Sequence, residues 1–87
     1  MPEVLIRYCV PCRYEFKAIQ DADAILKEFG DELTDLRLVP GPRGAYDVEV
    51  DGKLVFSLDK ALRFPETSEL IRKIRARIKP RKARKKA

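Results

Sequence analysis

The sequence of 87 residues contains no histidine and only two cysteines, and these absences limit its chemistry. A structural zinc site takes four ligands, which are mostly cysteine thiolates and histidine nitrogens. One copy of this chain supplies two such ligands, so a zinc ion could be held only between two chains. We therefore expect no metal ion and no tightly bound cofactor.

Long apolar runs are also missing. Near the N-terminus, Val4, Leu5 and Ile6 are followed at once by Arg7, which makes this run too short for a secretory signal. No stretch approaches the roughly 20 apolar residues that a membrane-spanning helix needs. Because the two cysteines are closely spaced and no export signal is expected, the sequence indicates a cytoplasmic protein without a membrane span.

Acidic residues are absent from the last part of the chain. All 14 of them lie within residues 1–71, whereas residues 72–87 are only basic or uncharged, although the net charge of the whole chain is +5. Residues 1–78 are predicted to form one small folded domain. Residues 79–87 are predicted to be a disordered tail because they are too charged to fold by themselves.

The basic tail has three candidate roles: a solvated end, an arm that binds an acidic protein or an anionic membrane, or an arm that binds phosphates nonspecifically. No aromatic residue lies beyond Phe64, so the tail lacks a base-stacking surface and nucleic acid is not the expected partner. The candidate anion-binding residues are Arg81, Lys82, Arg84, Lys85 and Lys86.

Cys9 and Cys12 form a Cys-x-x-Cys pair between an apolar run and a segment with helical periodicity. The short loop lets the two thiols close into a disulfide with little backbone movement, and a loop this small adds little stability. A helix that begins at the motif, with Pro11 in its first turn, would stabilise a thiolate there. The layout indicates a thiol–disulfide redox site; the alternative is a pair of incidental or buried cysteines.

The first half of the chain predicts a β-α-β unit. Residues 3–8 are expected to form a strand buried on both faces, followed by a helix that Gly30 ends. Charged residues, Asp21 among them, fall on the outer side of this helix. A right-handed crossover leads to a parallel strand at 36–39. The side chains predicted to face the sheet are Tyr14, Ala18, Ala22, Ile25, Leu26 and Phe29.

The second half predicts a hairpin and a helix. Strands at 46–50 and 53–57 flank an Asp51-Gly52 turn, with Leu54 and Phe56 on one face. A second helix follows Phe64-Pro65 and ends at Pro80, and its apolar residues are Leu70, Ile71, Ile74 and Ile78. The predicted fold is an α/β, thioredoxin-like β-α-β-β-β-α sandwich with a mixed four-stranded sheet and two helices.

Four blocks are distinctive when they are taken in order. They are Tyr8-Cys9-x-x-Cys12-Arg13-Tyr14, Val39-Pro40-Gly41-x-x-Gly44-x-Tyr46-Asp47-Val48, Val50-Asp51-Gly52-Lys53-Leu54-Val55-Phe56-Ser57 and Phe64-Pro65-Glu66-x-x-Glu69-Leu70. Together they resemble the selenoprotein W-like family, also called the Rdx or SelT/SelW/SelH family. The resemblance implies a thioredoxin-like redox domain in the cytosol, with glutathione, peroxides or protein thiols as partners.

The resemblance leaves the order of the two thiols open. In thioredoxins the first cysteine, here Cys9, attacks and the second resolves. In selenoprotein members of the family, selenocysteine occupies the position of Cys12, which implies the reverse order. Cys9 and Cys12 are therefore both candidate catalytic residues. Gly44-Ala45 stands where thioredoxins usually place a cis-proline.

Residues around the motif are candidate contacts to a partner or to glutathione, the expected reductant. The 40–44 loop either holds a glutathione carboxylate or only connects two strands. Tyr8 and Tyr14 are either donors beside the thiols or packing residues, and Phe64-Pro65 is a candidate apolar rim. The contacts proposed on this basis are Tyr8, Val10, Pro11, Arg13, Pro40, Gly41 and Gly44.

Two functional hypotheses follow. The first is reversible dithiol–disulfide exchange in antioxidant defence or redox signalling. The second is a non-catalytic interaction module whose tail binds nucleic acid or an acidic partner. The sequence leaves open whether the protein turns over as an enzyme and what its oligomeric state is.

Overall fold

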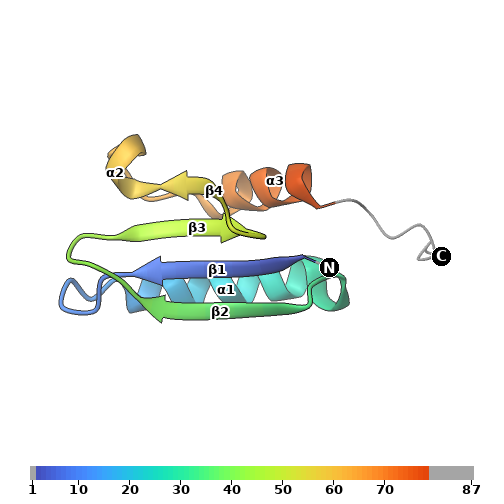
Figure 1. The fold of residues 1–87 in the computed structure, drawn as a ribbon, viewed down its shortest axis with the longest axis horizontal. Coiled ribbons are helices and arrows are strands. Elements are labelled where there is room, and N and C mark those ends of the chain that lie inside the picture. The colour runs from blue at the N-terminus through green and yellow to red at the C-terminus, as the bar shows by residue number, and fades with distance from the viewer. Residues whose placement is uncertain (1, 79–87) are drawn as a thin grey trace.

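The structure, a computed structural model, describes residues 2–78, and the predicted tail at 79–87 lies outside them. A four-stranded sheet in the order β2-β1-β3-β4 carries the two longer helices on one face (Figure 1). The predicted α/β sandwich with a mixed sheet is confirmed, and two short helices, η1 and α2, are additional. In chain order the elements are β1 (Glu3–Tyr8), α1 (Glu15–Phe29), η1 (Gly30–Glu32), β2 (Asp35–Pro40), β3 (Tyr46–Val50), β4 (Lys53–Ser57), α2 (Leu58–Ala61) and α3 (Thr67–Arg77).

Strand β1 lies in the middle of the sheet. It pairs parallel with β2, as predicted, and antiparallel with β3. Val4 and Ile6 are fully buried, whereas Leu5 and Arg7 point to the other face and are only half-buried. The predicted burial of β1 on both faces is therefore wrong, because α1 and α3 lie side by side on the same face of the sheet.

The predicted hairpin between β3 and β4 is confirmed, but its register is irregular. Asp51-Gly52 has φ angles of 52° and 82°, the left-handed pair that a tight hairpin turn needs. A register shift then pairs Val48 with Phe56 but Glu49 with Leu54. Neighbouring residues of β3 face opposite sides, so Phe56 is buried under the helices while Leu54 is 40% exposed. The prediction that these two side chains share a face is wrong.

Helix α1 buries a stripe that differs from the predicted one at two positions. Ala18, Ala22, Ile25 and Phe29 are buried as expected, and Gly30 follows the last helical residue. Leu26, however, is 50% exposed and Asp21 is fully buried. The periodicity put the charged Asp21 in solvent, whereas the structure gives its carboxylate hydrogen-bond donors in the interior.

Helix α3 begins with reciprocal hydrogen bonds between Glu66 and Glu69, which form a capping box. Its apolar residues Leu70 and Ile74 are fully buried, as the spacing predicts. The helix ends at Arg77, before the predicted stop at Pro80, because Ile78 is already extended, with φ of −105° and ψ of 124°.

Two isoleucines of α1 test this arrangement of the core. Ile25→Ala removes a fully buried side chain and should lower the free energy of unfolding by about 2–5 kcal/mol, measured by urea denaturation. Ile19→Ala is the matched control, because Ile19 lies on the same helix but is 54% exposed, and it should change stability by less than about 0.5 kcal/mol. Equal losses would contradict the packing of α1.

Candidate functional site

Cys9 and Cys12 form a disulfide at the carboxyl end of the central strand β1, with their Cα atoms 5.4 Å apart. The two sulfur-bearing side chains are not equally accessible. Cys9 is fully buried, whereas Cys12 is half-buried. A molecule that approaches from solvent therefore reaches Cys12 first.

The loop between the two cysteines is a series of turns rather than the start of a helix. The Arg13 N–H donates to the Val10 carbonyl at 2.9 Å, and the Tyr14 N–H donates to the Cys9 carbonyl at 3.3 Å. Arg13 has a φ of 65°, which interrupts any right-handed helix at this residue. Helix α1 begins only at Glu15, so the prediction that a helix starts at the motif, with Pro11 in its first turn, is wrong.

The 40–44 loop meets the cysteine motif at one end of the sheet (Figure 1). The Gly41 N–H donates to the Tyr8 carbonyl at 2.7 Å, and the Cys9 N–H donates to the Ala45 carbonyl at 2.9 Å. Gly41 has no room for a side chain, since a Cβ would overlap with the aliphatic part of Arg7. Pro40 pairs with Tyr8 at the end of β2, and the exposed Gly44 lies in the same loop.

Two arginines near the motif differ in their availability to a ligand. Arg7 lies on the uncovered face of the sheet, where its guanidinium donates to the Glu49 carboxylate at 2.9 Å. Arg13 is exposed, and its guanidinium lies 5.8 Å from the centre of the Phe16 ring, a cation–π contact. Val10 beside it is 44% exposed. Of these two arginines, Arg13 is therefore the more accessible to a ligand.

A buried polar cluster lies in the core, and the sequence did not predict it. The Tyr46 hydroxyl donates to the Asp21 carboxylate at 2.6 Å, and the Thr67 hydroxyl donates to it at 3.2 Å. Lys17 approaches the same carboxylate at 3.1 Å. Burial, and then the hydrogen bond to Asp21, raises the pKa of Tyr46 far above its ordinary value. The available signal was Tyr46 itself, because a buried tyrosine hydroxyl needs a partner.

Three aromatic rings connect the cysteine loop to the segment before α3. Tyr14 lies 4.9 Å from Phe64 and 6.5 Å from Tyr46, both edge to face, and Tyr46 lies 5.4 Å from Phe64. Tyr14 is thus a packing residue. Phe64 is 38% exposed, while Pro65 beside it is buried.

Within residues 2–78, no cluster of three or more histidine, cysteine, aspartate or glutamate side chains is arranged to hold a metal ion. No helix among these residues is long and apolar enough to cross a membrane.

Sequence comparison finds relatives over most of the chain. The model of the Rdx family matches residues 3–76. The chain is 33% identical over 72 residues to Migration and invasion enhancer 1 from Bos taurus and to the protein of the same name from Mus musculus. These alignments cover 83% of this chain but only 61% of each relative, so the chain spans about three fifths of their length.

Solved structures of similar proteins share the fold. A protein from Bordetella parapertussis has a TM-score of 0.85 and 29% identity, over 87% of this chain and 96% of that chain. A Selenoprotein W-related protein from Vibrio cholerae has a TM-score of 0.86 and 22% identity, over 90% of this chain and 98% of that chain. The predicted thioredoxin-like fold is thereby confirmed.

Tyr46→Phe tests the buried cluster. Removing the hydroxyl leaves the Asp21 carboxylate without its shortest donor and should cost about 1–3 kcal/mol in unfolding free energy near neutral pH. Tyr14→Phe is the control, because it also removes a tyrosine hydroxyl but keeps the ring contacts of Tyr14. The unfolding free energy of this variant should fall by less than that of Tyr46→Phe.

The same variant makes a prediction about pH. Because the pKa of Tyr46 is raised in the folded protein, its contribution to stability is complete below the unfolded tyrosine pKa of about 10 and is lost as the pH rises above it. Urea denaturation at a series of pH values should therefore show the gap between the wild type and Tyr46→Phe narrowing above about pH 10. A constant or widening gap would contradict the assignment.

Proposed function

Because the chain belongs to the Rdx family, we propose that it is a thiol–disulfide redox protein that exchanges a disulfide between Cys9 and Cys12 with external thiols and disulfides. The observation that carries the proposal is the closed Cys9–Cys12 pair at the end of the central strand, with one cysteine buried and the other reachable. Such an arrangement separates an attacking sulfur from a resolving one.

The accessible sulfur, that of Cys12, is the entry point for reduction. An external thiolate attacks Cys12 Sγ, the Cys9–Cys12 bond breaks, and its electron pair leaves on Cys9 Sγ, which takes up a proton. A second external thiolate then attacks the external sulfur of the mixed disulfide and releases Cys12 as a thiolate. In total two external thiols are oxidised to one disulfide, and the protein gains two electrons.

The oxidative direction uses the same two residues. The Cys12 thiolate attacks a substrate disulfide or a peroxide, giving a mixed disulfide or a sulfenic acid. Cys9 then displaces the substrate thiol or water and restores the Cys9–Cys12 bond. This order matches the family resemblance, in which the position of Cys12 holds selenocysteine in selenoprotein members.

We propose that glutathione is the reductant. We further propose that the protein acts in the reducing cytosol and contributes to cell redox homeostasis. Its two carboxylates suit the exposed guanidinium of Arg13, and its backbone suits the open surface formed by Val10, Pro11 and the 40–44 loop. The backbone of this loop already lies against the strand that carries Cys9.

Single cysteine variants test the order of attack. Cys9→Ser, incubated with oxidised glutathione, should form a stable adduct on Cys12, seen by mass spectrometry. Cys12→Ser should form its adduct on the buried Cys9 at least about tenfold more slowly, because access limits the exchange. A faster reaction of Cys12→Ser would reverse the order. If neither variant reacts, and the wild-type disulfide resists glutathione, the redox function is wrong.

Arg13→Gln tests the proposed contact with glutathione. In this variant the Cys9–Cys12 disulfide should be reduced by glutathione about threefold to tenfold more slowly than in the wild type, since a charge-assisted contact is lost. Reduction by the uncharged dithiothreitol should be nearly unchanged. Arg37→Gln, at an exposed arginine of β2, is the matched control and should leave both rates as in the wild type. Equal slowing with both reductants would contradict the contact.

A further inference from the structure

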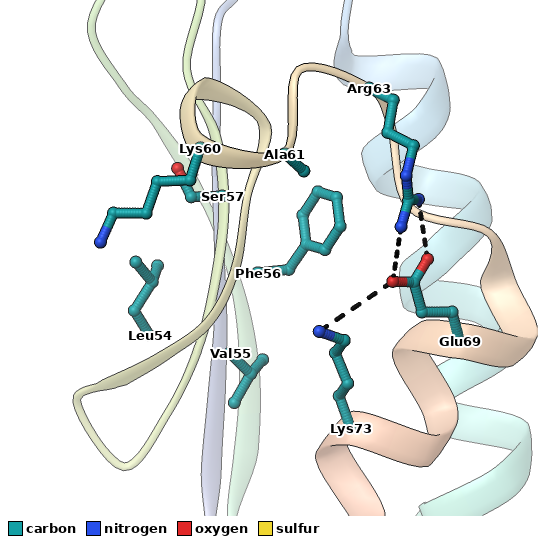
Figure 2. A pocket seen from close by; sticks show the side chains of 9 residues that line it. All are labelled: Leu54, Val55, Phe56, Ser57, Lys60, Ala61, Arg63, Glu69 and Lys73. Carbon is teal, nitrogen blue, oxygen red and sulfur yellow. Dashed lines mark hydrogen bonds and ion pairs between the residues drawn. The ribbon is translucent and has the colours of Figure 1, made fainter.

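Strand β4 is an edge of the sheet, and a hollow of about 320 Å³ lies along it. Within residues 2–78, no turn, loop or cap hydrogen bond reaches the backbone of Lys53–Ser57. Half of the backbone N–H and C=O groups of an edge strand point away from the sheet and are free to pair with another chain. Figure 2 shows this hollow at close range.

The side chains that line the hollow come from both faces of the strand. Leu54 and Ser57 lie on one side of β4, together with Lys60 from α2, whereas Val55 and Phe56 lie on the side of α3 (Figure 2). The hollow therefore surrounds the free edge itself. An extended backbone with side chains pointing alternately to the two sides is the shape that fits such a place.

The hollow is positively charged. Arg63 donates two hydrogen bonds to Glu69, at 2.8 and 2.9 Å, so one cation is neutralised. The hydrogen bond from Arg63 lowers the pKa of Glu69 to about 2, which keeps this pair ionised. Lys73 lies 4.0 Å from the same carboxylate and is half exposed, and Lys60 is exposed with no partner in the described chain.

A second hollow continues the first along α3. It has a volume of about 240 Å³, shares Leu54, Val55 and Lys73 with the first, and adds Ala76 and Arg77. We call the two together the β4 edge groove. Its walls are apolar near the strand and carry four cations, at Lys60, Arg63, Lys73 and Arg77, against a single carboxylate.

We propose that the β4 edge groove binds an extended, acidic segment of another protein, which adds to the sheet as a strand beside β4. The charge of the groove argues against two other occupants, the C-terminal residues of this chain and a second copy of it. Residues 79–87 contain no acidic residue, and a second copy would bring an equally positive edge, so both would be repelled. The one aromatic side chain of the groove, Phe56, is 5% exposed and offers no face for stacking a nucleic-acid base.

This surface does not depend on the proposed redox function. The residues that line the groove include neither cysteine. Phe64, which follows Arg63 in the sequence, contacts Tyr14 beside the cysteine loop, but Phe64 does not line the groove. Binding is therefore expected in the double variant Cys9→Ser/Cys12→Ser as in the wild type.

The experiment uses the full chain and a fluorescein-labelled peptide of eight alternating glutamate and valine residues. Fluorescence anisotropy should show saturable binding that weakens as NaCl is raised from about 50 to about 300 mM, since salt screens the charges. The same peptide with lysine in place of glutamate should not bind. In the 15N-labelled protein, saturating acidic peptide should slow hydrogen exchange of β4 amides by about tenfold or more, because new backbone pairs protect them.

Charge-reversal variants locate the site. Lys60→Glu and Lys73→Glu should each weaken peptide binding by about fivefold or more. Lys27→Glu, which makes the same change of net charge on α1 outside the groove, should weaken it less than about twofold.

Three results would overturn the proposal: no saturable binding of the acidic peptide, equal effects of the three reversals, or binding that protects no amide of Lys53–Ser57. Loss of binding in the double cysteine variant would also contradict it. If only the glutathione experiments fail, the proposed redox function is wrong, whereas acidic peptide should still bind to the β4 edge groove.

Discussion

The hydrogen bond between Asp21 and Tyr46 is the contact on which the rest of this small domain depends. It joins α1 to the first residue of β3, and Thr67 brings the start of α3 to the same carboxylate. A charge that is fully buried must be satisfied by donors, so the three elements have to meet in this one arrangement. The residue before Tyr46 is Ala45, whose carbonyl accepts the Cys9 N–H. Adjacent residues at the start of β3 therefore contact the buried carboxylate and the backbone of Cys9.

The Cys9–Cys12 disulfide and the β4 edge groove lie on one sheet but are built differently. The disulfide is held by backbone hydrogen bonds at the end of a central strand, with one sulfur buried. The groove is open, and its walls combine apolar side chains near β4 with cationic side chains from α2, α3 and the segment between them. Arg63 and Phe64 are neighbours in sequence, and they belong to the groove wall and to the aromatic cluster at Tyr14 respectively. The wall of the groove and the aromatic cluster next to the cysteine loop are therefore adjacent in the chain.

Strands, hairpin and topology could be predicted from the sequence because their signals are local. Alternating apolar residues indicate β3, and Asp51-Gly52 is typical of a tight hairpin turn. The cysteine pair was equally visible, and the structure closes it into a disulfide. The predicted tail and the roles of the contact residues stay predictions.

What the sequence could not show depends on contacts far apart in the chain. Asp21 looks like a surface residue until Tyr46, 25 positions later, is placed beside it. Leu26 looks like a core residue from its spacing, but its side chain lies outside the buried face of α1. The left-handed Arg13, which delays the start of α1, has no local signal, since arginine is not a residue that favours this conformation. The shift in β4 likewise arises from pairing and not from composition.

The anchoring of Cys9 has a consequence for how the oxidation state could be sensed. The Cys9 backbone is fixed by Ala45, and its side chain is buried, so opening the disulfide need not disturb the sheet. We expect any rearrangement on reduction to fall on the turns between Val10 and Arg13. The oxidised and reduced proteins would then be almost the same molecule everywhere else. A partner that distinguishes the two states would have to contact this tetrapeptide. The redox state would then change the structure locally and not the overall fold.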